Sequence, residues 1–93
     1  MYDGRFEWDD AKAEANLAKH GVSFPLAVQV FDDPNAIEDL DPNPGEERWR
    51  IIGTAEGRIL FVVYKELADA RIRLVSARKA TKNEQKRYFE EYR

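Results

Sequence analysis

The side chains best suited to chemistry in this sequence are arginines at alternate positions. Arg48 and Arg50 are two residues apart, and so are Arg71 and Arg73, with Arg78 shortly after them. Residues two apart on a β-strand share a face, so each pair predicts a basic strip on a sheet, and hairpin pairing can bring the strips together. Arginine forks bind phosphate and stabilise charge that builds on a phosphoryl group. The pattern suits a phosphodiester such as RNA, with an ion-paired, solvated face as the alternative.

His20 is the only histidine in the chain, which excludes an acid–base pair of two histidines. Histidine changes its charge near neutral pH and serves as a general acid or base, so His20 is a candidate for proton transfer. Lys19 and His20 also fall in the last turn expected of a helix, where the helix dipole favours cations. Capping of that helix is the alternative role for both residues.

Aromatic side chains offer a second way of holding RNA, because the bases of single strands stack on them. The candidates are Trp8, Trp49, Tyr64 and Tyr88. Core packing is the stronger expectation for Trp49 and Tyr64, which lie in strand-like segments.

Metal-dependent and thiol-dependent chemistry are disfavoured. The chain has no cysteine, and it lacks a glycine-rich phosphate loop, a GxSxG motif and a metal-ligand spacing of histidine and acidic residues. Glu46 and Glu47 are adjacent, so alternation on a strand would point them apart. We therefore expect no metal ion and no other cofactor.

Composition predicts one globular domain over residues 1–93, since the chain is short, 43% hydrophobic and 35% charged. The N-terminus lacks the apolar run of a signal peptide, and no stretch reaches the ~18 apolar residues of a membrane span. We therefore expect a cytoplasmic protein. The net charge of −3 hides an asymmetry, because residues 71–93 carry eight positive and three negative side chains while residues 1–70 carry seven and fifteen. The basic end suits a polyanion and the acidic remainder suits a basic partner.

Two helices are expected in the first third of the chain. The first begins at an N-cap, Asp9, and ends at Gly21. Its apolar stripe is expected to consist of Ala11, Ala15, Leu17 and Ala18. Ser23 caps a second, short helix with Pro25 in its first turn, and Pro34 ends it.

The remaining sequence predicts strands and one more helix. We expect an edge strand at 36–40, a loop at 41–45, a strand from Trp49, a tight hairpin at 55–57, a central strand at 59–64 and a further strand at 71–77. Thr81 and Glu84 form a capping box for a helix at 82–92, whose apolar side carries Tyr88, Phe89 and Tyr92. The fold class is α+β, with N-terminal helices, an antiparallel sheet of three to four strands and a C-terminal helix.

Several of these segments resemble the BrnT toxin family. In the first half the resemblance rests on FEWD at 6–9, NLAKHGVSF at 16–24 and FDDP at 31–34. In the second half it rests on ERW at 47–49 before IG at 52–53, on IRLVSARKAT at 72–81, and on Glu84 with Tyr88. The segment at 16–24 and the RLVSARKAT stretch are the specific parts.

This resemblance implies a RelE-like fold and a metal-independent ribonuclease of a type II toxin–antitoxin system that arrests translation and growth. It also implies neutralisation by a BrnA-type antitoxin, a ribbon-helix-helix DNA-binding protein. The pair would form a heterotetramer that represses its own operon, so this chain would reach operator DNA through its partner.

The residue roles follow from the chemistry of RNA, whose 2′-hydroxyl is the nucleophile, so that positioning and charge stabilisation suffice. We expect Arg78 to contact the scissile phosphate, Arg48 and Lys19 to hold the RNA, and His20 or Lys82 to move a proton. Further RNA contacts are expected from Arg50, Arg71, Arg73, Lys79 and Tyr88. The same cations would also serve a non-catalytic module that docks an acidic antitoxin segment or DNA. A metal-dependent nuclease is a third possibility, which a chelator would inhibit.

Overall fold

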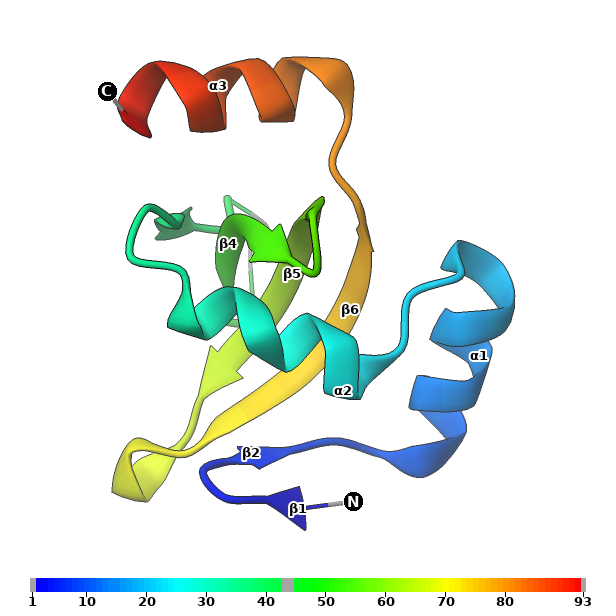
Figure 1. The fold of residues 1–93 in the computed structure, drawn as a ribbon. Coiled ribbons are helices and arrows are strands. Elements are labelled where there is room, and N and C mark those ends of the chain that lie inside the picture. The colour runs from blue at the N-terminus through cyan, green and yellow to red at the C-terminus, as the bar shows by residue number, and fades with distance from the viewer. Residues whose placement is uncertain (1, 43–44, 93) are drawn as a thin grey trace.

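The computed structural model describes residues 2–42 and 45–92, and its centre is one sheet of six strands in the order β1-β2-β6-β5-β4-β3 (Figure 1). Three long strands, β4 (Trp49–Ala55), β5 (Arg58–Glu66) and β6 (Ile72–Lys79), pair antiparallel, and β3 (Ile37–Leu40) is the edge strand beside β4. On the other side, β1 (Tyr2–Asp3) pairs antiparallel with β2 (Phe6–Glu7), which pairs parallel with β6.

The expected α+β class is therefore confirmed, but the expected antiparallel sheet of three to four strands is wrong. The sheet is mixed and has six strands. The two additional strands have two residues each, which is too short to show the alternation that predicts a strand. Part of the expected loop at 41–45, residues 43–44, lies outside the described residues.

The helices begin and end where their capping residues predict. In α1 (Asp10–His20), the Asp9 carboxylate accepts the Lys12 N–H at 3.1 Å, and Gly21 ends the helix with a φ of 69°. Ser23 caps α2 (Phe24–Ala27), which continues as the 3₁₀ helix η1 (Val28–Asp32). A second 3₁₀ turn, η2 (Ala68–Ala70), joins β5 to β6, and α3 (Lys82–Tyr92) follows β6. None of the described helices is long and apolar enough to cross a membrane.

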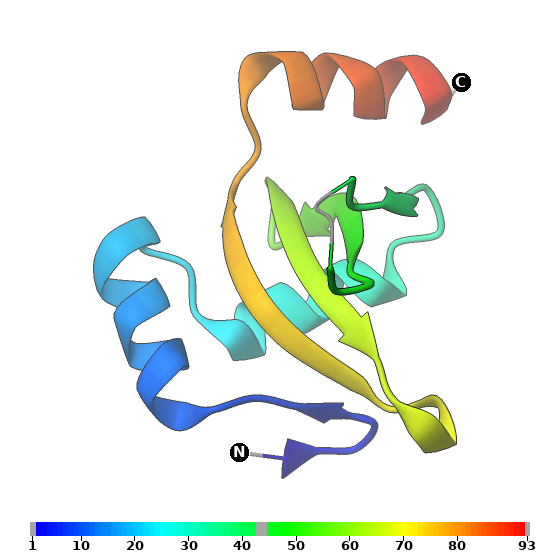
Figure 2. The same ribbon diagram turned by 180° about the vertical axis from the view of Figure 1, so that it is seen from behind.

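The two faces of the sheet are covered differently. On one face, α2 and η1 bury the main core, whose largest fully buried side chains include Phe24, Leu60 and Val62. On the opposite face, α3 packs against β4 over a smaller cluster that includes Ile52 and Tyr88. The view from behind looks on to this second face, with α3 across one end of the sheet and α2 beyond the strands (Figure 2).

A β-bulge in β6 decides which residues reach the second face. Val63 pairs with Ser76, but the next residue of β5, Tyr64, pairs with Leu74, so Val75 is the extra residue. The alternation of side chains therefore shifts by one at Val75. Leu74 and Ala77, three residues apart, are both in the main core at 2% and 0% exposure.

The bulge brings two arginines of β6, Arg73 and Arg78, on to one face. Lys65 pairs with Arg73, Val63 with Ser76, and Phe61 with Arg78, and paired residues of an antiparallel ladder share a face. Without the bulge, Arg73 and Arg78 would point to opposite faces, because they are five residues apart.

Helix α1 packs along the edge of β6 (Figure 1), but not through the expected apolar stripe. Leu17 is 49% exposed, and Ala11, Ala15 and Ala18 are exposed as well, so that expectation is wrong. The buried residue of α1 is Asn16, at 8% exposure. Its side-chain amide donates to the carbonyls of Val22 (3.0 Å) and Ala77 (2.8 Å), and its oxygen accepts the Ala77 N–H at 3.1 Å. The side-chain amide of Asn16 thus satisfies both backbone groups of Ala77, as the backbone of a neighbouring strand would.

Candidate nucleic-acid interface

A basic groove runs between α1 and β6. One hollow is lined by Lys12, Lys19 and His20 from α1 and by Val75 and Ser76 from β6. The α1 residues share one side of the helix because they are seven and eight residues apart, close to two helical turns. Asn16, on the same side, lies at the base of this hollow and holds the helix against β6.

A second hollow continues the first, since Lys12 and Val75 line both. It adds Asp9, Glu46, Arg48, Lys65 and Arg73. The two hollows together form what we call the basic groove, which contains five lysine and arginine side chains and His20 against two carboxylates. The groove has the charge that a polyanion requires.

The groove brings together four of the predicted site residues, namely Lys19, His20, Arg48 and Arg73. Within the described ranges, Lys19 and His20 have no carboxylate partner. Arg48 reaches Glu46 at 3.4 Å, and Lys65 contacts the same carboxylate. The Arg48 Nε is buried and has no hydrogen-bond partner among the described residues. A buried donor of this kind is costly unless a ligand or water satisfies it.

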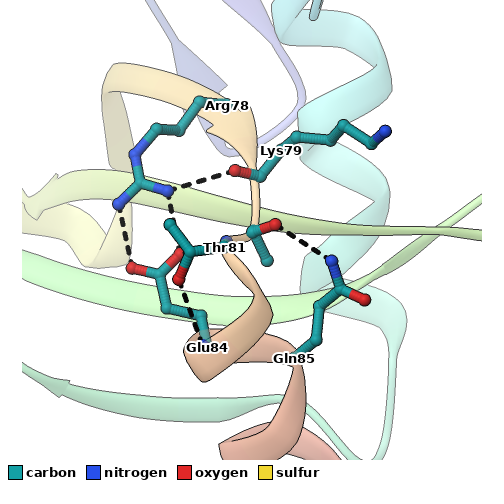
Figure 3. Close-up of polar contacts among 6 residues, drawn as sticks. Arg78, Lys79, Thr81, Glu84 and Gln85 are labelled. Carbon is teal, nitrogen blue, oxygen red and sulfur yellow. Dashed lines mark hydrogen bonds and ion pairs between the residues drawn. The ribbon is translucent and has the colours of Figure 1, made fainter.

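Arg78 lies beside the groove, two residues beyond Ser76 on the same face. Its two terminal nitrogens donate to the two carboxylate oxygens of Glu84 at 2.8 and 2.9 Å, and its guanidinium stacks 4.1 Å from the centre of the Phe61 ring. Glu84 and Thr81 also form the expected capping box (Figure 3). The hydrogen bond from Arg78 contributes most to lowering the pKa of Glu84, and those from Thr81 add to it. Together they lower this pKa by more than burial raises it.

Arg50 and Arg71 are ion-paired, as the alternative interpretation of the arginine pairs predicts. Arg50 donates to Asp39 at 2.7 Å, and Arg87 donates to the same carboxylate at 2.8 Å. These hydrogen bonds, that from Arg50 first, lower the pKa of Asp39. Arg71 shares Glu7 with Arg73. Neither Arg50 nor Arg71 lines the basic groove.

Three further candidates lie away from the groove. Tyr88 is 2% exposed and donates to Asp33 at 2.6 Å, so its ring is not open to a base. The Lys79 side chain extends away from Arg78 (Figure 3), because consecutive strand residues point to opposite faces. Lys82 is exposed at the start of α3 and does not line the groove.

The other aromatic candidates serve the core. Trp8 and Tyr64 are buried, at 6% and 4% exposure, and Trp49 packs against the same cluster. Tyr64 donates to Glu38, and burial together with this carboxylate raises the pKa of Tyr64 above its ordinary range. Stacking of a base on Trp8 or Tyr64 would require the core to open, whereas Trp49 is only partly buried.

Sequence reasoning missed Lys12, Lys65 and Ser76 as groove residues. The spacing of Lys12 from Lys19 and His20 was a usable signal, since it places all three on one helical face. Lys65 lies at the end of a strand that reads as apolar, and its pairing with Arg73 depends on the register of two strands. Ser76 faces the groove only because of the bulge at Val75. Among the described residues, no group of three or more histidine, cysteine or acidic side chains is arranged to hold a metal ion.

Comparison with known proteins agrees with the arrangement of these elements. The model of the ribonuclease toxin family BrnT, of type II toxin–antitoxin systems, matches residues 8–84. The fold is similar to the crystal structure of the Brucella abortus ribonuclease toxin BrnT, with a TM-score of 0.64 and 28% sequence identity over 83% of this chain and 96% of that chain. No curated protein sequence matches the chain. The matched range contains every residue of the basic groove.

Proposed function

The chain belongs to the BrnT family of ribonuclease toxins of type II toxin–antitoxin systems, and on this premise we propose that it cleaves RNA in the basic groove without a metal ion. The observation that supports this most is the gathering of Lys12, Lys19 and His20 opposite β6 in a groove rich in cations. Cations of this kind bind the phosphates of RNA.

The reaction is attack of a ribose 2′-hydroxyl on the neighbouring phosphorus. A bond forms between the 2′-oxygen and phosphorus, the bond from phosphorus to the 5′-oxygen breaks, and a 2′,3′-cyclic phosphate and a 5′-hydroxyl result. One proton leaves the 2′-hydroxyl and one reaches the 5′-oxygen. His20 is the proton-transfer group in this proposal, because it lines the groove and Lys82 does not.

The cations hold the phosphates and stabilise the charge that builds on the scissile one. Lys19 and Arg48, which line the groove, bind the RNA. Arg78 contacts the scissile phosphate. Its carboxylate partner and the ring of Phe61 fix its guanidinium in place, and a fixed cation needs no reorganisation when charge develops.

The proposal extends to the biological setting of the family. The chain acts in the cytoplasm, where cleavage of RNA arrests translation and growth. Its antitoxin is a BrnA-type ribbon-helix-helix protein that forms a heterotetramer with it, and operator DNA is bound through that partner. Salt-dependent complex formation is expected, because the first 70 residues carry an excess of acidic side chains.

Growth of bacteria that express the chain alone tests this function, with total RNA isolated in parallel. We expect growth arrest and RNA cleavage by the wild type, and loss of both in Arg78→Ala. The matched control is Arg58→Ala, since Arg58 is exposed in β5 and points to the opposite face of the sheet from Phe61 and Arg78. Normal growth and intact RNA with soluble wild-type protein would instead support a non-catalytic binding module. Undiminished arrest by Arg78→Ala would exclude the role given to Arg78.

A further inference from the structure

Ser76 is a serine that the bulge at Val75 turns from the core on to the basic face. In an uninterrupted strand, Ser76 would point to the same side as Leu74, which is buried in the main core. The register shift instead places Ser76 beside Val63, on the face that carries Arg73 and Arg78. Bulges that re-aim a side chain are over-represented next to active sites.

The surroundings of Ser76 are cationic. It lines the hollow that also contains Lys12, Lys19 and His20. The side chain is half-buried, and its hydroxyl has no hydrogen-bond partner among residues 2–42 and 45–92. A serine hydroxyl can rotate to donate to whichever acceptor is present, and cations on one side favour an anionic acceptor.

We propose that Ser76 is an RNA-contacting residue whose hydroxyl donates a hydrogen bond to a non-bridging phosphate oxygen in the basic groove. This rests on the proposed ribonuclease function and adds a neutral donor to its cations. The hydroxyl approaches the phosphate from the β6 side while Lys12 and Lys19 approach it from α1. Three donors on two elements fix the position of the phosphate better than the two flexible lysine side chains would do alone.

The test compares Ser76→Thr with Ser76→Val, two side chains of the same shape of which only threonine has a hydroxyl. Both are β-branched and suit a strand, so a difference between them reports the hydroxyl alone. The measurements are kcat and KM for cleavage of an RNA oligonucleotide, and the affinity for the same oligonucleotide with a 2′-deoxy nucleotide at the cleaved position. Ser76→Ala checks that the added methyl groups do not block the groove, and thermal unfolding checks the fold.

A hydrogen bond to a charged group is strong enough that its loss is expected to lower kcat/KM about tenfold to a hundredfold. We expect this loss in Ser76→Val and Ser76→Ala, with weaker binding of the 2′-deoxy oligonucleotide, and activity close to wild type in Ser76→Thr. If the wild type cleaves RNA and Ser76→Val or Ser76→Ala is equally active, the role given to Ser76 is wrong, while the proposed function stands. Absence of cleavage by the wild type would overturn the proposed function and this inference with it.

Discussion

The hydrogen bonds that the Asn16 amide makes between α1 and β6 lead to a quantitative prediction for Asn16→Leu. The substitution removes three hydrogen bonds that join Asn16 to Val22 and Ala77. Each buried hydrogen bond of this kind contributes about 1 kcal/mol net, so the free energy of unfolding should fall by about 3 kcal/mol, and by more if the backbone groups of Ala77 stay without partners. For a domain of this size that corresponds to a fall in Tm of about 12 to 24 °C.

Urea and thermal unfolding measure this loss. The matched control is Asn83→Leu, since Asn83 is exposed in α3, and a change within about 0.5 kcal/mol is expected there. Asn16→Asp is informative as well, because a carboxylate can accept the Ala77 N–H but cannot donate to either carbonyl. If Asn16→Leu were as stable as Asn83→Leu, the amide would not be what holds α1 to β6, and the placement of Lys19 and His20 would need another explanation.

Three further predictions concern the ion pair of Glu84 with Arg78, the buried Tyr88 and the basic groove. Folding lowers the pKa of Glu84, so its carboxylate stabilises the fold at every pH above its ordinary pKa of 4.5, and this stabilisation is lost as the pH falls through the folded pKa. Urea titrations should show that the wild type is more stable than Glu84→Gln near pH 7 and that the difference disappears below pH 4.5. Tyr88→Phe removes the hydrogen bond to Asp33 and should lower the unfolding free energy by about 1 kcal/mol while leaving KM for RNA unchanged; a raised KM would return Tyr88 to the RNA site. Lys12→Ala should reduce the slope of log affinity for single-stranded RNA against log salt concentration by about 0.7, whereas Lys86→Ala, exposed on α3, should leave that slope unchanged.

Local sequence signals were sufficient for most of the fold. Asp9, Ser23 and the Thr81–Glu84 box each begin a helix as predicted, because a capping interaction involves residues three apart in the chain. The strands with apolar residues also lie where predicted. The parallel pairing of β2 with β6 could not be predicted, since it joins Phe6 and Glu7 to residues more than sixty positions away.

The candidate site was predictable in its residue types and less so in its geometry. The sequence indicated that arginines would gather on one face, but it did not show which of them are paired with carboxylates. Glu7, Asp39 and Glu84 each come from a different element, and only the tertiary structure brings them to their partners. The bulge at Val75 is equally invisible, because regular alternation is the default expectation for a strand.

Cleavage of two matched oligonucleotides in the presence of EDTA tests the central claim most directly. One is RNA throughout, and the other has a single 2′-deoxy nucleotide at the position whose 3′-phosphate is cleaved. The mechanism predicts that the purified chain cleaves the first to a 2′,3′-cyclic phosphate and a 5′-hydroxyl and leaves that position of the second intact. Cleavage of the 2′-deoxy position, or activity that EDTA abolishes and a divalent metal ion restores, would contradict it.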